Sequence, residues 1–119
     1  MENDFIFIDD ATDGERRIFH RKLFYKYIRE LIIKFFNVKL ENNQINQRII
    51  NYLDNLKEAG DVYFLMHEMP YHWALSIIQN TIEVDEGIMY NKERKEEELD
   101  FCRKFLKEHN IKYFLEETK

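Results

Sequence analysis

The chain has 119 residues, a net charge of −5 and a single cysteine, and 45% of its residues are hydrophobic. A chain of this length can bury a core of its own, so we expect one domain over residues 1–119. The single cysteine, Cys102, excludes an internal disulfide framework and a zinc site built from several thiolates. The acidic start and the absence of a long uncharged apolar run lead us to expect a soluble, cytoplasmic protein without a signal peptide or a membrane segment.

The N-terminal segment, residues 1–12, carries a charge of −4 and contains one short apolar run at residues 5–8. That run is too short for a signal peptide, and it is flanked by acidic residues on both sides. We expect this segment to form either a strand or a loosely ordered arm.

The first predicted helix covers residues 13–37 and is amphipathic. Its apolar residues share one face, while Lys22, Lys26 and Arg29 recur at helical spacing on the opposite side. Such a basic stripe can contact phosphates, so a nucleic-acid-associated regulator is our second functional hypothesis. The sequence pI of about 5.4 argues against it, because nucleic-acid-binding domains are usually more basic.

The next two predicted helices cover residues 43–59 and 61–81. Ile45, Ile49 and Leu53 form the apolar face of the first, and Gly60 is its predicted terminator. The second is expected to bend or restart at Pro70, because proline lacks an amide hydrogen and clashes with the preceding turn.

The run HEMPYHW, residues 67–73, resembles in composition a zinc-protease signature with one extra residue. Five-residue spacing places His67 and His72 about 140° apart on a helix, so they cannot share a metal ion in the usual way. An enzyme built on His67, Glu68 and His72 is our third hypothesis, and we expect no metal and no cofactor. Trp73 is predicted to be a core anchor.

After Pro70, polar residues recur at helical spacing and predict a stripe that faces solvent or a partner. The stripe comprises His72, Ser76 and Gln79. The last predicted helix covers residues 91–110, with Cys102 on its inner face as a small hydrophobe. Its acidic residues are expected to form a partner-facing surface comprising Glu93, Glu96, Glu97, Glu98 and Asp100.

The C-terminal segment alternates apolar and polar residues over positions 111–117, a pattern typical of a half-buried strand. It is expected either to pair with the N-terminal segment as a small two-stranded ribbon or to dock as a short helix. The expected fold is therefore a compact bundle of four to five helices, all-α or nearly so.

The leading functional hypothesis is a small, acidic, non-enzymatic protein-binding module. It would act as an inhibitor, an immunity protein or a phage or bacterial accessory protein that occludes a larger partner. The reasons are the absence of a convergent catalytic set, the acidic last helix and an aromatic content of 15%. The expected partner is another protein or a second copy of the chain, rather than nucleic acid or a membrane.

Overall fold

The computed structural model describes residues 5–9, 15–36, 41–54, 58–67, 70–79 and 92–117. The elements of this part are β1 (Phe5–Asp9), β2 (Glu15–Phe19), α1 (Arg21–Phe35), α2 (Asn42–Asp54), α3 (Ala59–Met66), α4 (Pro70–Gln79), α5 (Lys92–Glu108) and β3 (Leu115–Glu117). Most of the described residues are helical, which confirms the predicted fold class, a compact and nearly all-α bundle of five helices with a small terminal sheet. Within these ranges no helix combines the length and the apolar character that a membrane span requires.

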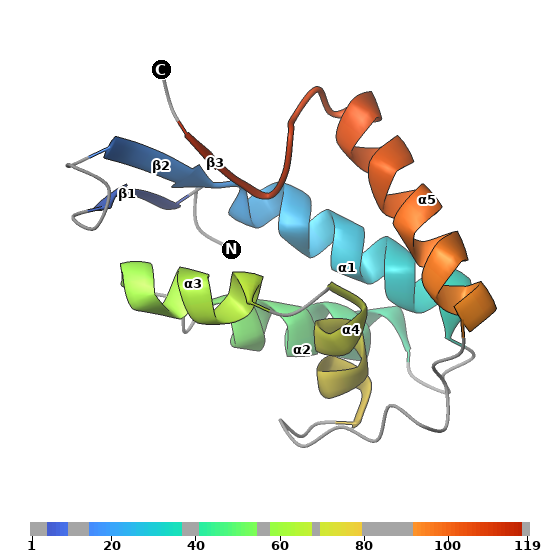
Figure 1. Ribbon diagram of the computed structural model, residues 1–119. Helices are drawn as coiled ribbons and strands as arrows, with labels where there is room; N and C mark the ends of the chain where they lie inside the picture. The colour runs from blue at the N-terminus through green and yellow to red at the C-terminus, as the bar shows by residue number, and fades with distance from the viewer. Residues whose placement is uncertain are drawn as a thin grey trace.

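Both terminal segments form strands, which was one of the two alternatives for each, but they do not pair with each other as a two-stranded ribbon: each pairs with β2. The sheet order is β1-β2-β3 and both pairings are antiparallel. Phe19 lies opposite Phe5 on one side and opposite Leu115 on the other. Strands β1 and β3 therefore flank the central strand β2, as Figure 1 shows at one end of the molecule.

Strand β2 corrects the prediction that residues 13–37 form one helix. Residues 15–19 are extended, and helix α1 begins at Arg21. Hydrogen bonds from β1 and β3 satisfy the backbone of β2 on both edges, while Phe19 is fully buried. The His20 amide donates to the Phe114 carbonyl at 2.8 Å, and this contact joins the end of β2 to the C-terminal segment.

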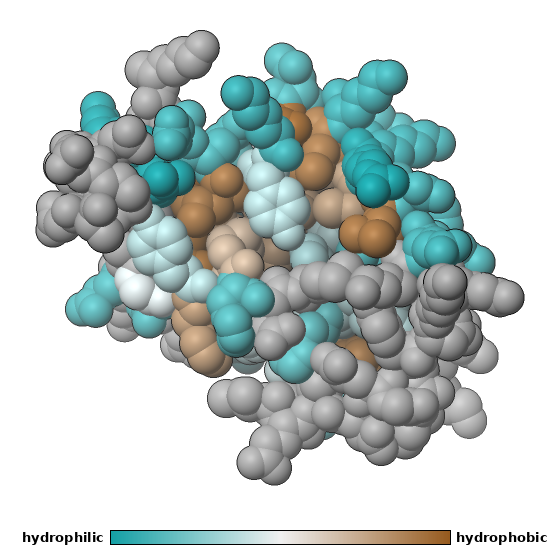
Figure 2. Space-filling view, viewed as in Figure 1, coloured by the Kyte–Doolittle hydropathy of each residue, from teal (hydrophilic) through white to brown (hydrophobic). Residues whose placement is uncertain are grey.

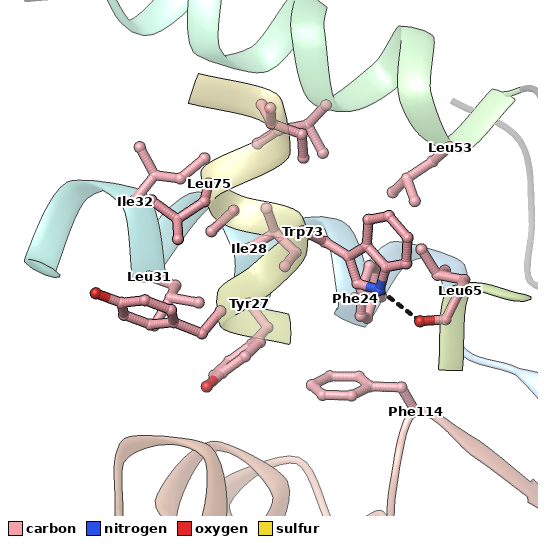
Figure 3. Packing of buried hydrophobic residues seen from close by; sticks show 14 of the residues in the cluster. Phe24, Tyr27, Ile28, Leu31, Ile32, Leu53, Leu65, Trp73, Leu75 and Phe114 are labelled. Carbon is pink, nitrogen blue, oxygen red and sulfur yellow. Dashed lines mark hydrogen bonds between the residues drawn. The ribbon is translucent and has the colours of Figure 1, made fainter. Parts of the chain in front are cut away.

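Helix α1 lies at the centre of the molecule and contacts α2, α4 and α5 (Figure 1). Its predicted apolar face is confirmed: the buried residues are Phe24, Tyr27, Ile28, Leu31, Ile32 and Phe35. Figure 3 shows that Trp73 and Leu75 of α4 pack against this face, with Leu53 of α2 beside them. These side chains have almost no solvent exposure, so α1 carries the main hydrophobic core.

The predicted restart at Pro70 is confirmed. Helix α3 ends at Met66, and α4 begins with the proline, which needs no amide donor at a first helical position. Trp73 is 1% exposed, and its indole N–H donates to the Leu65 carbonyl (Figure 3). The tryptophan is therefore a core anchor, as expected, and it links α4 to α3.

Gly60 does not terminate the preceding helix. Helix α2 ends at Asp54, and Gly60 is the second residue of α3. The Glu58 amide donates to Asp61 Oδ2 at 3.0 Å, so an acidic side chain determines where α3 begins. The end of α5 is as predicted, because Asn110 takes a left-handed conformation with φ of 54° and the Ile111 amide donates to the Leu106 carbonyl.

Replacing Trp73 by phenylalanine should lower the free energy of unfolding by about 2–3 kcal/mol, as measured by urea denaturation followed by circular dichroism. The substitution leaves the buried Leu65 carbonyl without its indole donor and also creates a cavity. The matched control is Ile33→Val, which shortens an apolar side chain that is 51% exposed and should change stability by less than about 0.5 kcal/mol. Equal effects of the two substitutions would contradict the anchoring role.

Candidate functional site

Two adjoining hollows, each of about 370 Å³, lie between helices α1 and α5, and we call them together the α1–α5 groove. The residues that line both hollows are Lys34, Phe101 and Lys104. The first hollow is completed by Glu30, Ile33, Phe105 and Glu108, and the second by Phe35, Glu97 and Asp100.

The groove follows from the antiparallel packing of α5 on α1. The ring of Phe101 lies 5.6 Å from that of Phe35 near the end of α1, and Lys26 lies near His109 at the end of α5. On α5, positions 97, 101, 104 and 108 recur at helical spacing and form one stripe beside α1. Figure 1 shows α5 lying across α1 on one side of the bundle.

Part of the groove lining is apolar. Ile33 is 51% exposed, and the half-buried Phe101 ring stacks on Tyr27 at 5.5 Å. The Lys34 ammonium lies 4.8 Å from the centre of the Phe101 ring, within the range of a cation–π contact. Apolar side chains and a cation near an aromatic ring therefore line the same groove.

The charged part of the groove lining is predominantly acidic. Its lining includes the carboxylates of Glu30, Glu97, Asp100 and Glu108 and the ammonium groups of Lys34 and Lys104. This lining has a net charge of −2. The groove thus combines exposed apolar surface with negative charge, an arrangement suited to a cationic ligand with apolar side chains.

Three of the acidic residues predicted on the last helix are exposed: Glu96, Glu97 and Asp100. Glu97 and Asp100 line the groove, and Asp100 accepts a hydrogen bond from Arg103 at 3.3 Å. Glu96 does not belong to the groove lining among the described residues. The side chain of Glu93 lies outside the described part of the structure.

Glu98 corrects the prediction of a uniformly exposed acidic surface, because it is only 1% exposed. Its position lies four and seven residues before the buried Cys102 and Phe105, so helical geometry directs it to the core side of α5. The spacing of Glu98 from Cys102 and Phe105 could have predicted its burial, but the three consecutive glutamates at 96–98, taken together, predict one exposed group.

The buried Glu98 carboxyl pairs with a buried tyrosine. Tyr27 donates its hydroxyl hydrogen to Glu98 Oε1 at 2.6 Å, while Glu98 Oε2 has no hydrogen-bond partner among the described residues. Burial raises the pKa of Glu98, and the hydrogen bond from Tyr27 opposes this effect. Burial also raises the pKa of Tyr27, and the neighbouring Glu98 adds to that shift. Both groups are therefore favoured in their protonated forms.

Substituting Glu98 by glutamine should remove a pH dependence of stability. The pKa of Glu98 in the folded protein lies above its ordinary value of 4.5. At a pH between these two pKa values, the folded protein binds more protons than the unfolded chain, so the free energy of unfolding falls as the pH rises. Relative to Glu98→Gln, the wild-type protein should lose stability as the pH increases above about 4.5. Urea denaturation of both proteins across a pH series measures this difference.

The neighbouring substitution Glu97→Gln is the matched control, because Glu97 is exposed and lies one residue away on the same helix. Its stability difference from wild type should stay nearly constant over the same pH series. A pH-independent difference for Glu98→Gln as well would contradict the proposed protonation of the buried carboxyl.

Cys102 is buried on the inner face of α5, as expected. Burial raises the pKa of its thiol to about 11, although the hydrogen bond with Tyr27 lowers it and Glu98 raises it further. A thiol that is both buried and protonated is a poor nucleophile. Cys102 therefore acts as a small apolar residue in the core.

At pH 8, Ellman's reagent should react with Cys102 at least about a hundredfold more slowly in the folded protein than in urea-unfolded protein. The thiolate fraction is about one in a thousand for a pKa near 11 and about one in ten for the ordinary value of 9.0. Burial of the sulfur slows the reaction of the folded protein further, because the reagent cannot reach it. Comparable rates in the two states would show that the thiol is accessible and reactive.

The polar stripe predicted on α4 is not an open surface, because Ser76 is 4% exposed. Helix α4 packs against both α1 and α2, and the neighbours of the serine along the helix, Leu75 and Ile77, are also buried. Arg48 of α2 donates to the carbonyls of Ile77 and Ile78 at 3.3 and 3.0 Å. His72 and Gln79 remain partly exposed, so the stripe retains two of its three members at the surface.

The predicted site at His67, Glu68 and His72 is incompletely described, because Glu68 lies outside the described residues. His67 is exposed at the end of α3, with Nδ1 3.4 Å from the Phe64 carbonyl oxygen. The ring of His72 lies edge-on to Trp73. Across the described ranges, histidine, cysteine, aspartate and glutamate side chains form no group of three or more that could hold a metal ion.

The basic stripe on α1 is divided between two neighbouring helices. Lys26 Nζ lies 3.3 Å from His109 Nε2 on the α5 side, while Arg29 Nε donates to Asn46 Oδ1 of α2 at 2.7 Å. Lys22 is exposed. The stripe therefore does not present three parallel cations to a phosphate backbone.

On the face shown in Figure 2, hydrophobic side chains reach the surface between α5, the sheet and helices α3 and α4, inside a hydrophilic rim. Two large aromatic side chains of α3 are also exposed, Phe64 at 54% and Tyr63 at 38%. The α1–α5 groove combines exposed apolar side chains with charged side chains of both signs. We therefore place the candidate site in the groove.

No family model, no curated protein and no solved structure matches this chain.

Proposed function

We propose that the protein is a non-enzymatic, acidic protein-binding module that occludes part of a larger partner, as inhibitory, immunity and accessory proteins do. The observation that carries the proposal is the α1–α5 groove, where exposed apolar surface at Ile33 and Phe101 lies among carboxylates. Protein interfaces commonly place apolar anchors at the centre and charged groups at the rim. We place its action in the cytoplasm.

Ile33 supports this proposal through its unusual exposure. It is 51% exposed on a helix whose other large aliphatic side chains are mostly buried. Covering the exposed half of an isoleucine removes apolar surface from water and favours association. The Phe101 ring beside it adds an aromatic anchor of the kind that contributes strongly to binding.

Electrostatics supports the same site. The net charge of the chain is −5, and residues 59–119, which include α5, account for that whole excess of negative charge. An acidic surface accelerates encounter with a basic partner and disfavours acidic ones. Glu97 and Asp100 bring this charge to the groove itself.

A photo-crosslinking p-benzoylphenylalanine at position 33 should capture a discrete host protein, because this position is exposed within the groove. The same group at Lys112, an exposed position outside the groove lining, should not capture that protein. Mass spectrometry of the crosslinked species identifies the partner.

The variant Ile33→Ser should reduce capture of that partner through a crosslinker at Lys104 by about tenfold, because it removes the apolar contact. The thermal unfolding midpoint should stay close to that of wild type, because the side chain is largely exposed. Identical capture from positions 33 and 112, or unchanged capture by Ile33→Ser, would exclude the groove as the binding site.

A further inference from the structure

We propose that the ligand of the α1–α5 groove is a cationic amphipathic helix of the partner, and that Lys34 occupies the position of one of its basic side chains until it binds. This inference rests on the proposed function, since it names the chemistry of the partner segment at the same site. Its supports are the charge, the length and the internal contacts of the groove.

The charge of the groove selects a cationic segment. Four carboxylates and two ammonium groups line it. The carboxylates lie in the outer parts: Glu30 and Glu108 line one hollow, and Glu97 and Asp100 line the other. A segment with basic residues towards both ends and apolar residues between them complements this pattern.

The length of the groove suits a helix of about three turns. Glu97 and Glu108 are eleven positions apart on α5, which corresponds to about 16 Å along the helix axis. A partner helix can therefore place basic residues about eleven positions apart and apolar residues at intervening helical spacing. An apolar stripe laid into a groove between two helices is a recurrent mode of peptide recognition.

Lys34 provides the third support. Its ammonium lies 4.8 Å from the centre of the Phe101 ring and 5.8 Å from that of Phe35, and Glu97 and Asp100 line the same hollow. Two aromatic rings with nearby carboxylates form a site that suits a cation. In the free protein the cation in this site belongs to the chain itself, so a basic side chain of the partner competes with Lys34.

The test uses a synthetic, fluorescein-labelled amphipathic helix of about fifteen residues, with leucines on one face and lysines elsewhere, titrated with the full-length protein by fluorescence anisotropy. The full-length protein should bind this peptide, and binding should weaken as the salt concentration rises. An otherwise identical peptide with glutamate in place of lysine should not bind. Equal binding of the two peptides would overturn the inference.

The protein variants locate the contact. Glu97→Gln combined with Asp100→Asn should weaken binding by about tenfold. Glu96→Gln is the matched control, since Glu96 is exposed on the same helix outside the groove lining, and it should bind like wild type. Equal losses for both proteins would show that the peptide responds to overall charge, and would overturn the assignment to the groove.

Lys34→Gln separates competition from a structural role. If Lys34 competes with the partner, this variant should bind the cationic peptide several-fold more tightly than wild type, with an unchanged thermal midpoint. Unchanged or weaker binding would overturn the competition. If the peptide fails to bind while the crosslinker at position 33 still captures a host protein, the inference of a cationic helix is wrong and the proposed function stands. If the peptide fails to bind and the crosslinker captures no protein, the inference and the proposed function are both wrong.

Discussion

The hydrogen bond between Tyr27 and Glu98 is the buried polar contact that joins α5 to the central helix α1. The Tyr27 ring contacts the rings of Phe101, Phe105 and Phe114, so one side chain of α1 meets both α5 and the segment before β3. A buried hydroxyl and a buried carboxyl each need a partner, and here each provides one for the other. The bond and these ring contacts together hold α5 against α1. Because the α1–α5 groove is the outer side of the same contact, its shape depends on this buried pair.

The two sides of α5 show how adjacent residues acquire opposite roles. Glu97 is exposed and lines the groove, whereas Glu98 is enclosed by the core. The chemical group is the same, but water stabilises the charge of the first and burial opposes the charge of the second. The acidic residues of this helix therefore lie on two sides of it: Glu97 carries negative charge at the groove, and Glu98 belongs to the core. Cys102, one turn beyond Glu98, belongs to the inner side for the same geometric reason.

The candidate site could be predicted from the sequence in part. An acidic surface on the last helix was expected, and Glu97 and Asp100 lie there beside the groove. The contribution of α1 was not expected, because Ile33 and Lys34 lie near the end of a helix whose apolar face is in the core. Sequence periodicity describes one helix at a time, whereas a groove needs the relative placement of two. The prediction that Ser76 faces solvent or a partner was wrong for a related reason, because α4 packs against both α1 and α2.

The sequence by itself determined the local features: the apolar faces of α1 and α2, the restart at Pro70, the buried Trp73 and the left-handed Asn110 just after the end of α5. Each of these follows from side-chain periodicity or from the backbone chemistry of a single residue. The tertiary structure alone decided that residues 15–19 form a strand, because their hydrogen-bond partners include residues 115–117, about a hundred positions away. It also decided which glutamate of α5 is buried and where α1 and α5 leave a groove. Those outcomes depend on contacts between distant segments, which no local pattern contains.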